Sequence, residues 1–254
     1  MPLRLISAVA ILSLCAFTQN LTPEMQADIN KRINFQRNWG SRASSPGAEL
    51  IGVQTARREV GRGVYVMAYE LKAKGLPLDI GYELLMAPTM AGSVEEIQSA
   101  GDFVLDKDGR VVNQDGSPYQ LVVPDPAAGE PYRFGLSAKE GKHVAFVTLL
   151  PNAIESNDRG CKASVVRLMR NFELAFVQLS GFPPDAEIPA RGNSEGEIHE
   201  FKLKTNAEGY ADAGVLPFKL GKTKGKMEIQ FTTPQCAPKV SFKWGSTGEG
   251  QPYQ

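Results

Sequence analysis

Histidine is the first residue type to consider, because few other side chains exchange protons near neutral pH. The sequence has two, His143 and His199. His199-Glu200 resembles the start of a zinc-protease motif, but Leu203 stands where the second histidine ligand is required. No Gly-x-Ser-x-Gly elbow supplies a serine nucleophile. Both histidines have charged neighbours at the start of expected strands, so we expect neither to have a Ser or Cys nucleophile and an Asp orienter around it.

Acidic residues offer two further possibilities. The segment Asp106-x-Asp108-Gly109 is half of a calcium loop, but Arg110 and two valines follow where oxygen ligands are needed. We interpret it as a hairpin turn. Glu95-Glu96 could supply the two carboxylates of a glycosidase, whose separation the sequence does not define. The alternative function is therefore a secreted hydrolase that uses carboxylates within residues 87–129, and we expect no metal ion and no cofactor.

Three cysteines occur, Cys15, Cys161 and Cys236. If an N-terminal signal is removed, Cys15 is lost with it and a pair remains in a chain bound for an oxidising compartment. Such a pair predicts a disulfide between Cys161 and Cys236, closing a loop of about 75 residues and contributing about 4 kcal/mol in the chain-entropy model. The competing interpretation is a free thiol close to a histidine, as Cys-His catalysis requires.

The first residues predict export from the cytoplasm. Arg4 is followed by an apolar stretch over residues 5–17 and then by polar residues, which is the pattern of a secretory signal peptide. Cleavage after Thr18 or after Ala16 fits, and we assign residues 1–18 to the signal. A lipoprotein signal ending at Cys15 and a buried N-terminal helix are the alternatives. The expected location is secreted or periplasmic.

Composition narrows the classes of function. The 254 residues include 28 Lys and Arg against 28 Asp and Glu, so the formal net charge is zero. No basic surface for nucleic acid is indicated, and no apolar run is long enough for a spanning helix. The length suits one large domain or two smaller ones, each able to bury a core.

Hydrophobic periodicity predicts mainly strands. Thr22-Pro23-Glu24 is a helix start, and Met25, Ile29 and Ile33 form one apolar stripe after it. From about residue 49 onward, short runs rich in aromatic and β-branched residues alternate with turn signals, which favours an all-β sandwich or barrel. The expected strands lie in residues 63–71, 103–105, 110–112, 132–136, 143–150, 172–179, 198–205, 210–216, 226–233 and 240–244.

A weak internal repeat accompanies this pattern. Gly75-Leu76-Pro77-Leu78-Asp79 and Gly181-Phe182-Pro183-Pro184-Asp185 each follow a strand-like run. In both, glycine permits a sharp turn, the apolar residue packs beneath it, and proline prevents a helix. We therefore treat Gly75, Pro77, Asp79, Gly181, Pro183 and Asp185 as structural turn residues. An insertion in the first copy, within residues 87–101 and 113–129, would account for the unequal spacing.

The second of these turns, followed by Thr205-Asn206-Ala207-Glu208-Gly209-Tyr210, resembles immunoglobulin-like modules of bacterial secreted and surface proteins. In such modules a Gly-Phe-x-Pro turn follows an early strand, and a Thr-x-x-x-Gly-aromatic hairpin lies mid-module. The resemblance covers roughly residues 162–245. It implies a β-sandwich with a binding, spacing or adhesive role, and it brings no catalytic residues.

These observations give an expected organisation of two immunoglobulin-like β-sandwich domains in tandem. The boundaries are a signal peptide at residues 1–18, a short helix and linker at 22–47, a first domain at 48–155, a second at 161–245 and a disordered tail at 246–254. The stretch 152–160 is polar and rich in turn residues, which is typical of a linker.

The expected function is that of a non-catalytic binding or spacer protein of the cell surface. Its partner would be a protein or carbohydrate whose identity the sequence does not give. Tyrosines concentrate in the first half of the chain and could form a ligand-binding platform. They are Tyr65, Tyr69, Tyr82, Tyr119 and Tyr132.

Overall fold

The computed structural model describes residues 21–39, 44–87, 97–168 and 174–245. The expected signal peptide, Glu95-Glu96 and the expected disordered tail lie outside these residues. In the described part of the chain the fold is almost entirely antiparallel β-structure, with one α-helix, α1 (Pro23–Asn38). No helix there is long and apolar enough to cross a membrane.

The strands fall into two groups, which we name the N-terminal and the C-terminal sandwich. The N-terminal sandwich contains β1 (Glu49–Gly61), β2 (Val64–Lys74), β3 (Tyr82–Ala87), β4 (Gln98–Leu105), β5 (Val111–Val112), β6 (Leu121–Pro124), β7 (Tyr132–Ala138) and β8 (Val144–Leu149). The C-terminal sandwich contains β9 (Ile154–Asp158), β10 (Cys161–Arg167), β11 (Ala175–Ser180), β12 (Glu187–Ser194), β13 (Glu197–Lys204), β14 (Ala211–Val215), β15 (Lys224–Phe231) and β16 (Lys239–Gly245).

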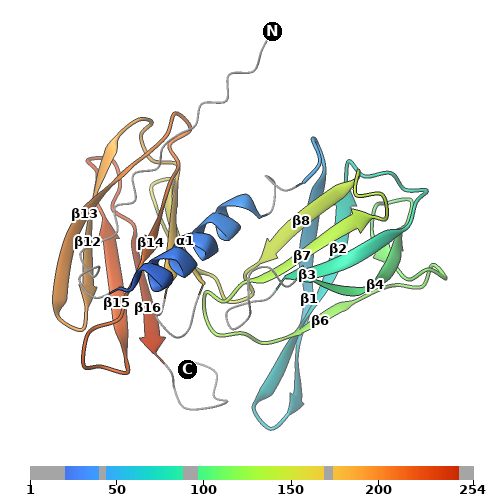
Figure 1. Ribbon diagram of the computed structural model, residues 1–254, viewed down its shortest axis with the longest axis horizontal. Coiled ribbons are helices and arrows are strands. Elements are labelled where there is room, and N and C mark those ends of the chain that lie inside the picture. Colours follow the sequence, from blue (N-terminus) through green and yellow to red (C-terminus); the bar gives the residue numbers. More distant parts are fainter. Residues whose placement is uncertain (1–20, 40–43, 88–96, 169–173, 246–254) are drawn as a thin grey trace.

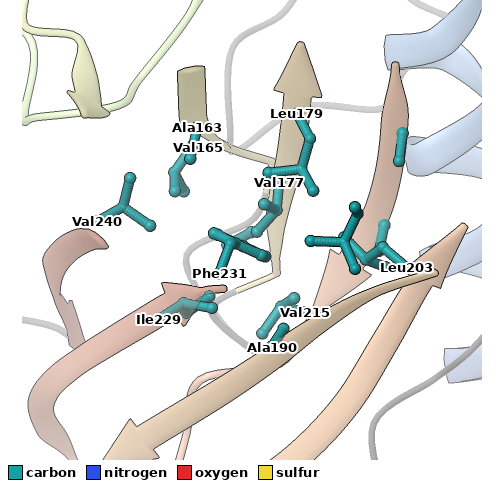
Figure 2. Packing of buried hydrophobic residues seen from close by; sticks show 14 of the residues in the cluster. Ala163, Val165, Val177, Leu179, Ala190, Leu203, Val215, Ile229, Phe231 and Val240 are labelled. Atoms are coloured by element: carbon teal, nitrogen blue, oxygen red, sulfur yellow. The ribbon is translucent and has the colours of Figure 1, made fainter. Parts of the chain in front are cut away.

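Each group consists of two sheets around its own core. In the N-terminal sandwich the sheets have the orders β1-β2-β6 and β5-β4-β3-β7-β8, and their inward side chains form one hydrophobic cluster. In the C-terminal sandwich the orders are β14-β11-β10-β9 and β13-β12-β15-β16. Figure 2 shows how side chains from both of its sheets, such as Val177 and Phe231, meet in the second core. The all-β expectation is confirmed.

The predicted disulfide is present. It joins Cys161, the first residue of β10, to Cys236 in the turn before β16, with Cα atoms 6.2 Å apart. Both cysteines are buried in the C-terminal core. The bond therefore ties one sheet of this sandwich to the other.

The sandwiches share one strand order. Removing β5 and β9 leaves β6-β2-β1 with β4-β3-β7-β8 in one, and β14-β11-β10 with β13-β12-β15-β16 in the other. The two predicted glycine turns occupy matching places in this scheme. An added Cβ at Gly75 would lie 2.2 Å from the Gly47 carbonyl oxygen, and one at Gly181 would lie 2.3 Å from that of Gly160. Both glycines have positive φ, 69° and 72°, which other residues rarely adopt.

Two hairpin turns at matching places, after β4 and after β13, also have the same hydrogen bonds. The side chain of Asp106 accepts from the backbone N–H groups of residues 108 and 110, at 2.8 and 2.9 Å. The side chain of Asn206 accepts from those of residues 208 and 210, at 3.1 and 2.9 Å. After the first turn the chain forms β5 and a further turn before β6, whereas the second turn leads directly into β14. Extra chain thus follows the first turn. It begins with β5, just before the expected insertion at residues 113–129, and residues 88–96 of the other expected insertion lie outside the described residues.

Some strands carry no sequence signal that identifies them. In β12, buried and exposed residues alternate strictly, but the sequence includes Pro189, Gly192 and Asn193, which are typical of loops. Strand β9 occupies much of the stretch 152–160 that was interpreted as a linker. It is a strand because it pairs with β10 and places Ile154 in the C-terminal core.

Helix α1 begins as predicted. Thr22 accepts a hydrogen bond from the backbone N–H of Met25 at 3.2 Å, and Pro23 occupies the first turn. Ile29 and Ile33 are fully buried, and they pack on the outward face of the sheet containing β10, β11 and β14. An added Cβ at Gly214 would lie 2.4 Å from Cδ1 of Ile33, so this glycine allows the helix to approach closely.

The C-terminal end of α1 contacts the other sandwich. Trp39 donates from Nε1 to the carbonyl oxygen of Val147 in β8 at 3.0 Å, and its ring packs edge-on against Phe146. The buried Arg133 of β7 donates to Gln36. The helix was expected to precede the first domain as a short separate element, and it instead lies between the two sandwiches (Figure 1).

Candidate functional site

The two histidines do not form the centre of a site. His143 is exposed in the turn before β8. His199 was expected at the start of a strand but is the third residue of β13, where its Nε2 lies 3.0 Å from Glu197 Oε1. These residues are two positions apart on one strand, so they share a face. The pair is therefore a local contact on an edge strand.

Three acidic residues of the first half, Asp106, Asp108 and Asp115, bond within their own turns. The side chain of Arg110 donates to the Asp108 carboxylate at 3.0 Å, within the same turn. Asp115 accepts from the Ser117 side chain and backbone, and these bonds lower the pKa of its carboxyl group. The backbone N–H groups lower the pKa of Asp106 as well. A general acid of a glycosidase needs the opposite shift. Within the described residues, no group of three or more His, Cys, Asp or Glu side chains is placed to hold a metal ion.

The structure separates the five candidate tyrosines. Tyr82 is a core residue of β3, and Tyr119 packs on Phe103 with ring centroids 4.3 Å apart. Tyr69 is also buried in this core, whereas Tyr65 and Tyr132 are partly exposed. The Tyr132 hydroxyl donates to the Pro124 carbonyl at 2.8 Å. The five tyrosines do not form one platform.

A pocket of about 390 Å³ opens along one side of the N-terminal sandwich, between β1 and β8, and Tyr69 lines it. Both are edge strands of their sheets. The pocket is lined by Glu49, Leu50, Ile51, Gly52 and Gln54 of β1, by Tyr69 of β2, and by Val147, Thr148, Leu149, Leu150 and Pro151 of β8 and the residues after it. It therefore combines apolar surface with hydroxyl, amide and carboxylate groups.

Beside this pocket, a polar network crosses from the β1–β2 hairpin to the end of β8. Arg57 donates to Asp125 at 2.9 and 2.6 Å, and its guanidinium lies 4.1 Å from the ring centroid of Tyr65. The other oxygen of Asp125 accepts from the side chain of Asn152 at 2.8 Å. Asn152 follows the pocket residue Pro151, and Asp125 lies close enough to the pocket residue Tyr69 to raise its pKa, so the network borders the pocket.

The charges of this site are already balanced. Burial raises the pKa of Tyr69 above 10.0, and the Asp125 carboxylate nearby raises it further. At neutral pH the Tyr69 hydroxyl is thus neutral and able to donate a hydrogen bond. Asp125 is held between a guanidinium and an amide. Such an arrangement orients groups for binding, whereas general-base catalysis needs an acceptor available to the substrate.

A second pocket, of about 330 Å³, lies on the C-terminal sandwich. Arg191 of β12 and Glu200 of β13 are cross-strand partners there. Exposed Glu200, Lys202 and Lys204 alternate along β13, and charged residues on an edge strand oppose strand-to-strand aggregation. This second pocket is a depression among such side chains on one sheet.

Sequence reasoning selected Tyr65, Tyr69 and Tyr132 but missed Gln54, Arg57, Asp125 and Asn152. Gln54 and Arg57 both lie on β1, whereas Asp125 follows β6 and Asn152 follows β8, far from β1 in the sequence. The hint available was Arg57-Arg58 in an otherwise β-like run, since two adjacent cations are uncommon in a strand that faces a core.

Comparison with known proteins adds no assignment to this geometry. Neither the protein-family models nor the curated proteins include a match to this chain.

Proposed function

We propose that this chain is a non-catalytic binding and spacer protein of the cell surface, secreted or periplasmic, built from two immunoglobulin-like sandwiches in tandem. The observation that carries the binding role is the site between β1 and β8. Arg57 and Asp125 neutralise each other beside a pocket that offers hydroxyl and amide groups, and the one carboxylate that lines it, Glu49, pairs with Lys74. This favours recognition of a ligand over proton transfer.

The tandem arrangement is supported by the common strand order and by the matching glycine turns. The spacer role is supported by α1, which contacts both sandwiches and so restricts their relative movement. The Cys161–Cys236 disulfide is compatible with an oxidising compartment.

The binding role is tested with purified residues 19–254. Immobilised cell-wall polysaccharide, peptidoglycan fragments and extracted envelope proteins are each titrated with the protein, and glycoside, ester and peptide substrates are assayed in parallel. Saturable binding without turnover is the expected result. Turnover that disappears in Asp125→Asn, while the circular dichroism spectrum is unchanged, would establish the hydrolase instead.

Localisation is tested with the full chain. Cell fractionation followed by N-terminal sequencing should find a protein outside the cytoplasm that begins after residue 16 or 18. An intact N-terminus in the cytoplasm would contradict the proposed location. Retention in the membrane fraction that is lost in Cys15→Ala would identify a lipoprotein.

A further inference from the structure

The shared strand order exposes one difference between the sandwiches. In the C-terminal sandwich, β9 pairs with the outer edge of β10 from Asp158 opposite Cys161 to Ile154 opposite Val165. The equivalent of β10 is β1. Among the described residues, β1 pairs with β2 alone, so the N-terminal sandwich has no strand in the β9 position.

Strand β9 also bridges to the opposite sheet. Ser156 accepts from the backbone N–H of Lys239 at 3.3 Å, and Asp158 accepts from that of Ala237 at 2.6 Å. It thereby closes the side of the sandwich between β10 and β16. In the N-terminal sandwich the equivalent side lies between β1 and β8, and this is where the 390 Å³ pocket opens.

On that side, Ser44 and Ser45 of the same chain occupy the position next to the first residues of β8. The hydroxyls of Ser44 and Ser45 accept from the backbone N–H groups of Phe146 and Val144, at 2.9 and 3.0 Å. These serines accept hydrogen bonds from the first part of β8, as Ser156 accepts one from the first residue of β16. The pocket begins beyond them, at Val147.

We infer that the pocket between β1 and β8 binds an extended peptide segment of a partner protein, which pairs antiparallel to β1 as β9 pairs with β10. An edge strand offers unpaired N–H and C=O groups, and strand addition is an established mode of peptide recognition. The inference rests on the proposed binding function and specifies its partner.

Charge indicates the composition of this segment. Beyond the pocket, β1 and the turn after it carry Arg58 and Arg62 against Glu59, a net charge of +1 in the sequence, in addition to Arg57, whose charge Asp125 balances. Figure 1 shows this part of the β1–β2 hairpin extending past the rest of the sandwich. Val53 and Val60 are exposed on the same strand, at 54% and 62%. An antiparallel partner would place its N-terminal residues beside the arginines, so we assign it an acidic N-terminal half followed by residues of β9 type.

The probe is the synthetic peptide Glu-Glu-Glu-Ile-Glu-Ser-Asn-Asp, which carries the β9 sequence behind an acidic leader. It is titrated into residues 19–254 while backbone amide signals and hydrogen exchange are followed by NMR. Saturable shifts and slower exchange at amides of β1 within residues 50–58 are expected. A peptide with lysines in the leader should bind more weakly.

Two variants test the site by different means. Arg58→Glu reverses an exposed charge and should weaken binding by about fivefold or more, since loss of one exposed ion pair alone accounts for up to about fivefold. Lys139→Glu, in the β7–β8 turn, makes the same change of charge at the other end of β8 and should have no effect. Thr148→Trp fills the pocket and should abolish binding of the peptide.

Three results would overturn the inference. One is binding of the peptide that is unaffected by both Arg58→Glu and Thr148→Trp. Another is slow exchange at the β1 edge before any peptide is added, which would assign the position to residues 40–43. The last is a dimer paired through β1 that the peptide does not dissociate. If Thr148→Trp leaves binding to the envelope components intact, the proposed function stands and only this site fails.

Discussion

At the scale of single residues, glycines determine where the chain can turn. Gly181 and Gly196 both have positive φ, 72° and 83°, but only Gly181 has backbone in the space that a side chain would occupy. The two positions therefore separate the conformational cost of alanine from the steric cost.

Gly181→Ala should destabilise the protein more than Gly196→Ala. Left-handed backbone alone costs about 1–2 kcal/mol for an alanine, and at Gly181 the new Cβ would also meet the Gly160 carbonyl oxygen at 2.3 Å. Urea unfolding followed by fluorescence measures both free energies. Equal losses would show that the close approach at this turn is not rigid.

Removal of the disulfide by Cys161→Ala with Cys236→Ala should lower the free energy of unfolding by about 4 kcal/mol, because the bond closes a long loop. The sequence separation of its cysteines is 75. Reduction of the unchanged protein should produce a similar loss. Stability that is independent of reductant would mean that the two sheets of the C-terminal sandwich hold together without the bond.

Glu228 should contribute to the stability of the β15–β16 sheet in a pH-dependent way. Lys226 and Lys239 donate to its carboxylate at 2.8 and 2.7 Å and lower its pKa from 4.5 to about 2. A lowered pKa stabilises the folded state above the unfolded value, and this contribution is lost as the pH falls from 4.5 towards 2. The difference in urea midpoint between the wild type and Glu228→Gln should therefore shrink over that window, whereas a constant difference would contradict the assignment.

At the scale of elements, α1 shows both what sequence patterns predict and where they stop. The cap at Thr22 and the stripe of Ile29 and Ile33 identified the helix and its buried face. The surface that this face covers was not predictable, because Gly214 and Phe176 reach it through the pairing of β11 with β14.

The same reasoning applies to the strands and to the pocket. Runs rich in valine and aromatic residues, as in β2 and β8, identified strands, whereas β1 was missed because its second half is polar and extends from the core. The pocket joins the edges of two sheets and depends on how the sandwich closes. Local pattern contains no information on that closure.

The contact between α1 and β14 is tested with a compensating pair. Gly214→Ala should destabilise the protein by about 1–3 kcal/mol, the usual cost of overpacking, because its Cβ would meet Cδ1 of Ile33. Ile33→Val removes that atom and alone should cost about 0.5–1.5 kcal/mol. The double variant should be more stable than the sum of the two losses predicts, as measured by a double-mutant cycle in urea. Simple additivity would show that the two side chains do not meet.

At the scale of the whole molecule, α1 connects two cores that otherwise have separate residues. Ile29 and Ile33 attach it to the C-terminal sandwich, and Arg37 pairs with Asp212 there. Trp39 attaches it to β8 of the N-terminal sandwich. The relative position of the sandwiches thus depends on both ends of this helix, together with the loop at Gly129, whose carbonyl oxygen accepts from the backbone N–H of Arg167 in β10.

Trp39→Ala should loosen this connection while both cores remain folded. Its ring contacts with Phe35 and Phe146, at 5.2 and 4.7 Å, and its bond to Val147 would be lost together. Small-angle X-ray scattering should then show a larger and broader distribution of interatomic distances, and circular dichroism should be unchanged. Arg62→Ala, at the exposed hairpin turn, serves as the control. Identical scattering from the wild type and Trp39→Ala would contradict a bracing role.

The position of α1 also has a consequence for the order of events during synthesis. The helix is among the first structures made, but its docking surface is complete only when Leu216 follows, roughly 180 residues later. At about 5–20 residues per second, α1 waits on the order of 10–35 s for its partner, and an isolated helix of this length is marginal in water. The N-terminal sandwich is therefore synthesised while α1 is still undocked. During that interval the residues of α1 are accessible to proteases, and docking of the helix afterwards buries Ile29 and Ile33.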